Sequence, residues 1–96
     1  MDEDMIEEIR NKVIDVLKKY GVKRAALFGS MVRGEATKNS DVDLLVEFKG
    51  EKSLLDLAGL KLELQDLLKR DVDVITYASI HPLLRERILR EQKVIL

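Results

Sequence analysis

The chain has 96 residues, 46% of them hydrophobic, and its 17 basic and 18 acidic residues give a formal net charge of −1. This length predicts one domain, residues 1–96, with a single core, and the lack of cysteine excludes disulfides and thiolate metal sites. The chain has no excess of basic residues that would indicate direct nucleic-acid binding. No apolar run approaches the roughly 20 residues that span a bilayer, and the acidic start lacks the basic region of a secretory signal. We therefore expect a cytoplasmic protein without membrane contact.

The first third of the chain predicts a helix, then a strand. Apolar residues recur at helical spacing over residues 5–20, with acidic residues at the start, basic residues at the end, and Gly21 as a C-terminal stop. The apolar run 25–28 predicts a buried strand that ends at Gly29. A short helix is expected after Gly29, and the polar residues 35–39 predict a loop.

A second strand, residues 42–48, is expected after this loop. Its period of two gives one face with Asp41, Asp43, Leu45 and Glu47 and another with Val42, Leu44, Val46 and Phe48. Ser53 then predicts the N-cap of a helix, with Asp56 completing a variant of the capping box. The expected buried stripe of that helix consists of Leu57, Leu60, Leu64, Leu67 and Leu68.

The last third predicts a strand and a helix. Residues 72–77 form an apolar run in which Asp71, Asp73 and Ile75 share a face. Ser79 is expected to cap the last helix and Pro82 to lie in its first turn, with an inner side of Ile80, Leu84 and Ile88. Residues 93–96 are compatible with a short edge strand, and His81 is expected to cap or pack rather than catalyse. The order α-β-α-β-α-β-α predicts an α/β (α+β) domain, with helices packed on a small sheet.

Gly29-Ser30 is the first candidate functional feature. A glycine directly after a strand lets the backbone approach a ligand closely, and the N–H groups that follow it attract anions. The residues therefore predict a phosphate-binding turn. Taken alone, the pair rather favours an ordinary strand-to-helix turn that has a serine N-cap.

Asp41 and Asp43 are the second feature, and ten residues separate them from Gly29-Ser30. Carboxylates two apart on a strand project side by side from one face, and magnesium binds one or two carboxylates together with phosphates and water. The alternative is a solvent-facing strand edge, where aspartate is common.

Asp73 adds a third carboxylate, inside the run Val72-Asp73-Val74-Ile75. A charge within a buried run is costly unless it is paired or binds a metal, which favours a metal ligand over the alternative of an exposed strand face. Three carboxylates that meet on adjacent strands are expected to raise one another's pKa. Asp71 is interpreted as a solvated strand end. Arg33 either clamps a triphosphate or pairs with Glu35 or Asp41.

With these residues in place, the chain resembles the minimal nucleotidyltransferases of the DNA polymerase beta-like superfamily. The resemblance rests on Gly-Ser-x-x-Arg-Gly at 29–34, Ser-Asp-x-Asp-Leu at 40–44 and Val-Asp-Val at 72–74. It implies a mixed sheet flanked by helices, with Asp41, Asp43 and Asp73 as catalytic ligands of two magnesium ions. It further implies that Gly29 and Ser30 hold the β- and γ-phosphates of ATP, with Arg33 over the same pocket.

The resemblance also implies a biological role. Small members of this superfamily look like the antitoxin half of two-gene modules whose toxin is a helical HEPN-type ribonuclease. The antitoxin would transfer AMP from ATP to a tyrosine of that toxin. Both a hetero-oligomer with the toxin and a homo-oligomer are compatible with this role.

Two other functions remain open. One is transfer of a nucleotide to a small molecule or a nucleic-acid end, although 96 residues leave little room for a second substrate-shaping domain. The other is a non-enzymatic module, either a nucleotide sensor or an antitoxin that acts by occlusion. The three carboxylates argue against it, because occlusion does not need them.

Overall fold

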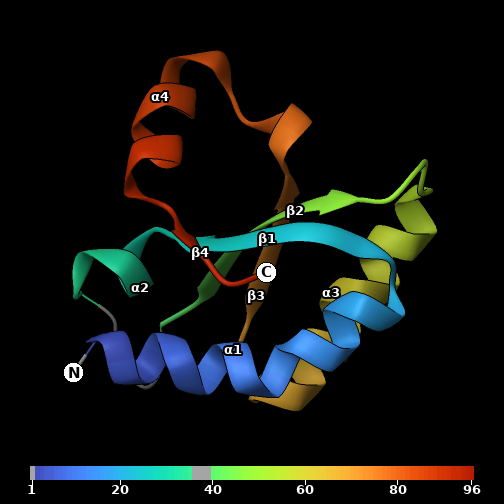
Figure 1. Ribbon diagram of the computed structural model, residues 1–96, viewed down its shortest axis with the longest axis horizontal. Helices are drawn as coiled ribbons and strands as arrows, with labels where there is room; N and C mark the ends of the chain where they lie inside the picture. The colour runs from blue at the N-terminus through green and yellow to red at the C-terminus, as the bar shows by residue number, and fades with distance from the viewer. Residues whose placement is uncertain (1, 36–39) are drawn as a thin grey trace.

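Four strands form one mixed sheet in the order β3-β2-β1-β4. The computed structural model describes residues 2–35 and 40–96, and Figure 1 shows their arrangement. The elements in chain order are α1 (Asp2–Lys19), β1 (Val22–Phe28), α2 (Ser30–Arg33), β2 (Val42–Phe48), α3 (Leu54–Leu68), β3 (Val72–Thr76), a 3-10 turn (Tyr77–Ser79), α4 (Pro82–Glu91) and β4 (Lys93–Val94). The predicted class, a small mixed sheet flanked by helices, is confirmed. Part of the predicted loop, residues 36–39, lies outside the described residues.

The strand pairing sets which residues become neighbours. β2 lies between two strands of opposite direction, because it pairs antiparallel with β1 and parallel with β3. β1 also pairs antiparallel with β4, so the edge strand that the sequence left open is present at Lys93–Val94. In this register Asp43 lies opposite Phe28 on one side and opposite Asp73 on the other.

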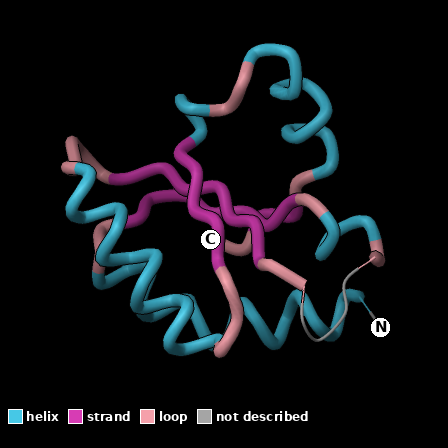
Figure 2. Tube along the Cα trace, turned by 180° about the vertical axis from the view of Figure 1, so that it is seen from behind, coloured by secondary structure: helices cyan, strands magenta, loops and turns pink. Residues whose placement is uncertain are grey.

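The two faces of the sheet are covered differently. Helices α1 and α3 lie against one face, and α4 lies on the other (Figures 1 and 2). The first face holds the larger core, built from alternate strand residues such as Leu27 and Leu44 packed with Leu17, Leu60 and Leu64 of the helices. The second face holds a smaller cluster of Ala26, Leu45, Tyr77 and Ile80. The predicted alternation of β2 is confirmed, and it places Asp43 on the α4 side together with Leu45.

Helix α3 begins as predicted, but its buried stripe is narrower. The Ser53 side chain accepts a hydrogen bond from Asp56 N (3.2 Å), and the Asp56 carboxylate accepts one from Ser53 N (3.0 Å). Leu60 and Leu64 are fully buried, whereas Leu67 is 39% exposed, so its assignment to the buried stripe is wrong. At 100° per residue, Leu67 falls on the flank of a stripe that runs through Leu60, Leu64 and Leu68.

The start of the last helix is also corrected. Ser79 does not cap it, because residues 77–79 form a 3-10 turn and the Ser79 hydroxyl bonds to Thr76 Oγ1 (2.8 Å). His81 is the N-cap, with its Nδ1 accepting from Leu83 N (3.1 Å), and Pro82 follows in the first turn. Leu84, predicted on the inner side, is 48% exposed.

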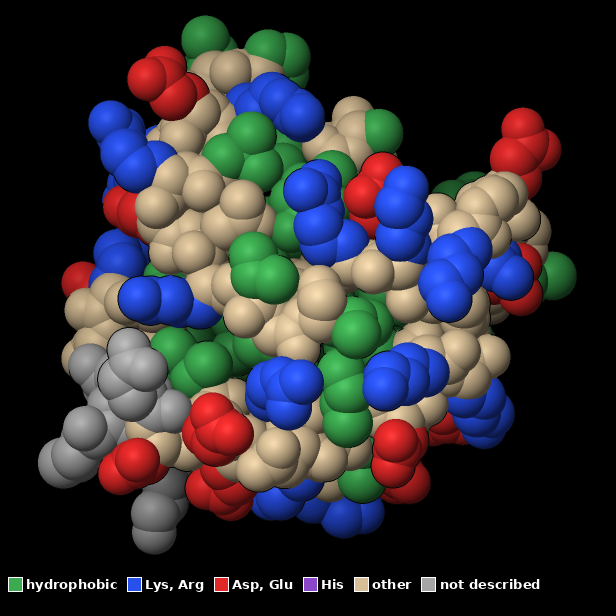
Figure 3. Space-filling view, in the orientation of Figure 1, with side chains coloured by type: hydrophobic (Ala, Val, Ile, Leu, Met, Phe, Trp, Pro, Cys, Tyr) green, Lys and Arg blue, Asp and Glu red, His purple; other side chains and the backbone are tan. Residues whose placement is uncertain are grey.

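The surface has an apolar tip where α4 begins. Leu83, in the first turn of α4, is 87% exposed. Figure 3 shows hydrophobic side chains at the top of the molecule, where Figure 1 places the start of this helix. Among residues 2–35 and 40–96, no helix is both long enough and apolar enough to cross a membrane.

Candidate active site

The turn after β1 can be made only by a glycine. Gly29 has φ 77° and ψ −146°, a region essentially closed to other residues, and it occupies the N-cap position of α2. A Cβ at this position would collide with the Asp43 carboxylate. The turn and the carboxylate are thus in direct contact. The serine N-cap interpretation is wrong, because Ser30 lies one residue inside α2 and no side chain caps the helix.

Asp43 is the centre of the carboxylate group. The β1–β2 register places it beside the Gly29 turn, and the β2–β3 register places Asp73 next to it on the parallel strand. Asp43 is half-buried, whereas Asp41 and Asp73 are exposed. The burial argument used for Asp73 is therefore wrong, since its face of β3 is open, but the predicted approach of carboxylates on adjacent strands is confirmed for Asp43 and Asp73.

The negative charges of Asp41 and Asp73 affect the ionisation of Asp43. Burial raises the pKa of Asp43, and the negative charges of Asp73 and then Asp41 raise it further. The Arg33 guanidinium acts in the opposite direction on this pKa. A group of like charges that disfavours its own ionisation is suited to bind a cation.

The donor set fits magnesium, which takes oxygen ligands and keeps one or two carboxylates with phosphate and water. Within the described part of the chain, no three acidic or histidine side chains converge closely enough to hold a metal by themselves. Phosphate oxygens or water would have to supply the other ligands of a metal bound here. The roles of Asp41, Asp43 and Asp73 as ligands stay a prediction.

A pocket of about 310 Å³ opens beside Asp43. One wall comes from the end of β1, α2 and β2 and consists of Phe28, Gly29, Arg33 and Asp43. The other wall comes from α4 and consists of Leu84, Arg87, Ile88 and Glu91. The sequence analysis missed this second wall as part of the site. The helical spacing of these four residues, which places them on one side of α4, could have indicated this wall.

Arg33 makes the pairing predicted for it and also faces the pocket. Its Nε donates to Glu35 Oε1 (2.8 Å), and its Nη1 lies 3.7 Å from Glu91 Oε2. The hydrogen bond that Arg33 donates to Glu35 raises the pKa of Arg33. Whether it clamps a triphosphate stays a prediction.

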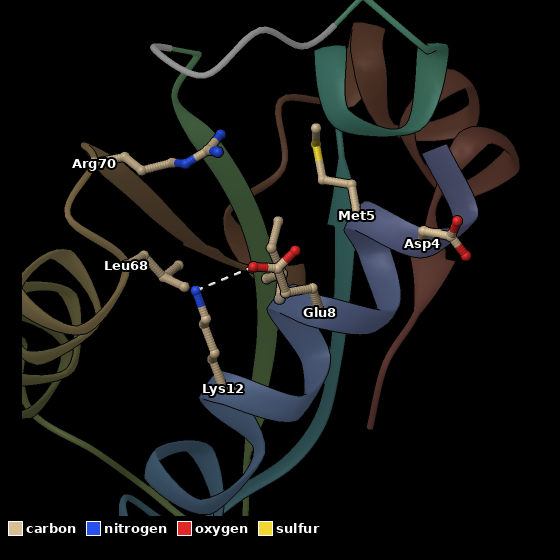
Figure 4. A pocket seen from close by; sticks show the side chains of 7 residues that line it. Asp4, Met5, Glu8, Lys12, Leu68 and Arg70 are labelled. Carbon is tan, nitrogen blue, oxygen red and sulfur yellow. Dashed lines mark ion pairs between the residues drawn. The ribbon is translucent and has the colours of Figure 1, made fainter. Parts of the chain in front are cut away.

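A larger pocket of about 420 Å³ lies elsewhere, between α1 and the end of α3 (Figure 4). Its rim carries the ion pair Lys12 Nζ–Glu8 Oε1 (3.3 Å), with Arg70 across from it. None of the six predicted site residues lines it, so pocket size does not locate the carboxylate site.

The comparison with known families now decides the assignment. A model described as the nucleotidyltransferase domain matches residues 7–95. The chain belongs to this nucleotidyltransferase domain family. Its sequence is 58% identical over 86 residues to "Putative protein adenylyltransferase MJ0435" of Methanocaldococcus jannaschii, a match that covers 90% of this chain and 92% of that protein.

Solved structures agree with the family assignment. This nucleotidyltransferase matches a structure described as a "putative minimal nucleotidyltransferase" with a TM-score of 0.80 and 42% identity, covering 97% of this chain and 95% of that one. A toxin-antitoxin crystal structure with AMP-PNP matches with a TM-score of 0.79 and 26% identity, covering 91% and 72% of the two chains. The predicted resemblance to minimal nucleotidyltransferases is confirmed.

Proposed function

We propose that this nucleotidyltransferase is a magnesium-dependent protein adenylyltransferase that acts as an antitoxin. It transfers AMP from ATP to a tyrosine hydroxyl of a cognate HEPN-type ribonuclease toxin. The single observation that carries the proposal is Asp43, which touches the Gly29 turn on one side and neighbours Asp73 on the other, at the mouth of a pocket. The relative named a protein adenylyltransferase and the toxin-antitoxin structure with AMP-PNP support the substrate and the partner.

The glycine turn and the carboxylates have different roles in this reaction. The backbone at Gly29 and Ser30 holds the β- and γ-phosphates, since backbone N–H groups that follow a strand at a helix start attract anions. Asp41, Asp43 and Asp73 would hold two magnesium ions. When bound, magnesium neutralises charge on the triphosphate and lowers the pKa of the acceptor hydroxyl.

The reaction is a displacement at phosphorus. The tyrosine oxygen attacks the α-phosphorus, the bond from that phosphorus to the oxygen of the β-phosphate breaks, and pyrophosphate leaves. Asp73 is exposed beside Asp43, which suits it to accept the proton of the hydroxyl if it serves as a base rather than as a ligand.

The test is intact-mass spectrometry of a candidate helical partner after incubation with this protein, ATP and magnesium. A gain of one or more AMP masses is expected, and it should vanish with Asp43→Asn and with a partner in which the acceptor tyrosine is phenylalanine. Complex formation without any mass change would replace the proposal with occlusion. Absence of a complex would redirect the search to small molecules and nucleic-acid ends as acceptors.

A further inference from the structure

The α4 wall of the pocket is held in a fixed place relative to the carboxylates. Arg85 Nη1 donates to the Tyr77 carbonyl oxygen (2.8 Å) near the start of the helix. Tyr77 Oη donates to Gln92 Oε1 (2.7 Å) just beyond its end. Because Tyr77 is buried in the small core of this face, α4 is tied at both ends to the sheet that carries Asp43. A ligand that enters the pocket beside Gly29 and Asp43 therefore meets α4.

Two arginines face this pocket, one from each wall, and they share a single carboxylate. Arg87 Nε lies 3.4 Å from Glu91 Oε1, and Arg33 Nη1 lies 3.7 Å from Glu91 Oε2. The side chains of Arg87 and Glu91 are 58% and 31% exposed, so water screens their attraction and the pair is weak. Charge-assisted, bidentate hydrogen bonds from arginine to phosphate are stronger than such a pair.

The remaining lining matches the other half of a nucleotide. Leu84 and Ile88 of α4 face the pocket together with Phe28 of β1, so an apolar surface lies beside the charged groups. A ligand with an anionic end and a flat apolar end fits this arrangement. The triphosphate would place its negative charge near Arg33, on the same wall as Asp43, and near Arg87, on the opposite wall.

We propose that Arg87 is a second phosphate-binding residue of the nucleotide site, and that Glu91 pairs with Arg87 and Arg33 before the nucleotide binds and competes with the triphosphate for them. This inference rests on the proposed function, because it assumes that ATP occupies this pocket. Helix α4 is then part of substrate recognition and not only a cover for the sheet.

The test is calorimetric titration of the intact protein with AMP-PNP and magnesium, which needs no acceptor. Arg87→Gln should weaken binding about tenfold, the loss typical of one charge-assisted hydrogen bond. Glu91→Gln should tighten it about two- to fivefold, because it frees Arg87 from its ion pair and leaves Arg33 paired with Glu35 alone. Arg90→Gln is the matched control, since it removes the same charge from an exposed position of the same helix that does not line the pocket.

The opposite changes in affinity expected for Arg87→Gln and Glu91→Gln distinguish a role in nucleotide binding from a purely structural role. Arg87→Gln and Glu91→Gln break the same ion pair, so a purely structural role would weaken binding in both, and that result would overturn the inference. Arg87→Lys keeps the charge and should recover part of the affinity, and thermal unfolding checks that each variant folds. Equal affinities for Arg87→Gln and Arg90→Gln would overturn the inference and leave the proposed function standing. Failure of the unmodified protein to bind AMP-PNP would overturn both.

Discussion

Replacing Gly29 with alanine should destabilise the protein through two separable effects. The backbone conformation at φ 77° and ψ −146° costs a non-glycine residue about 1–3 kcal/mol. The new methyl group would also collide with Asp43 Oδ2 and lie 3.2 Å from its Cγ, so the carboxylate must leave its preferred rotamer at a cost of about 1 kcal/mol. We therefore expect a loss of about 2–4 kcal/mol, which for a domain of this size lowers Tm by roughly 10–25 °C.

The assay is thermal unfolding followed by circular dichroism in the presence of a chelator. Gly50→Ala is the matched control, because Gly50 also has a positive φ (82°) but no atom lies within 4 Å of the added Cβ. Gly29→Ala should lose more stability than this control, and Asp43→Ala in the Gly29→Ala background should restore the collision part of the loss. Equal losses at the two glycines, or no coupling between positions 29 and 43, would refute the proposed contact.

Other changes test the site and the fold more briefly. Asp43→Asn should slow adenylyl transfer about 10²- to 10⁴-fold, as measured by single-turnover mass spectrometry, because it removes a metal-binding charge from the transition state; near-normal turnover would contradict its role. The pKa of Asp43 is raised in the folded state, so its ionisation above about pH 4 lowers stability. Without metal, Asp43→Asn should therefore melt higher than the unmodified protein at pH 7, and the two should converge as the pH falls toward 4; a lower Tm at pH 7 would contradict the charge crowding. Magnesium should raise Tm of the unmodified protein more than that of Asp43→Asn, since only the folded state has the site; equal shifts would argue for a different metal position. Ser53→Ala should cost about 1 kcal/mol in urea unfolding by removing the α3 cap, and an unchanged midpoint would contradict the capping box.

Most of the fold follows from local sequence signals. The helical period of α1, the alternation in β2 and the Ser53–Asp56 capping box each specify an element without help from distant residues. The start of α4 did not follow from local signals, because Ser79 and His81 are both plausible caps. The choice depends on Thr76, whose hydroxyl bonds to Ser79.

Several residues of the site could be predicted from the sequence, but the walls of its pocket could not. Gly29, Asp43 and Asp73 were found because the end of one strand and the alternation of the next two place them at one location. The burial of Asp73 was misjudged, since an apolar run does not reveal that one face of its strand is open. The α4 wall was missed because its approach to Asp43 depends on Tyr77 and Gln92, which touch only in the folded chain.

The unequal covering of the sheet separates the residues that keep the protein folded from those that decide what it binds. The α1–α3 face carries most of the buried side chains, whereas the α4 face carries a small cluster and the pocket. A saturation mutagenesis map should therefore divide along the sheet. Positions such as Leu60 and Leu64 should tolerate only similar apolar residues, while Leu83 and Leu84 can change with little loss of stability. Changes in one short helix can therefore alter what the pocket binds without a change in the larger core.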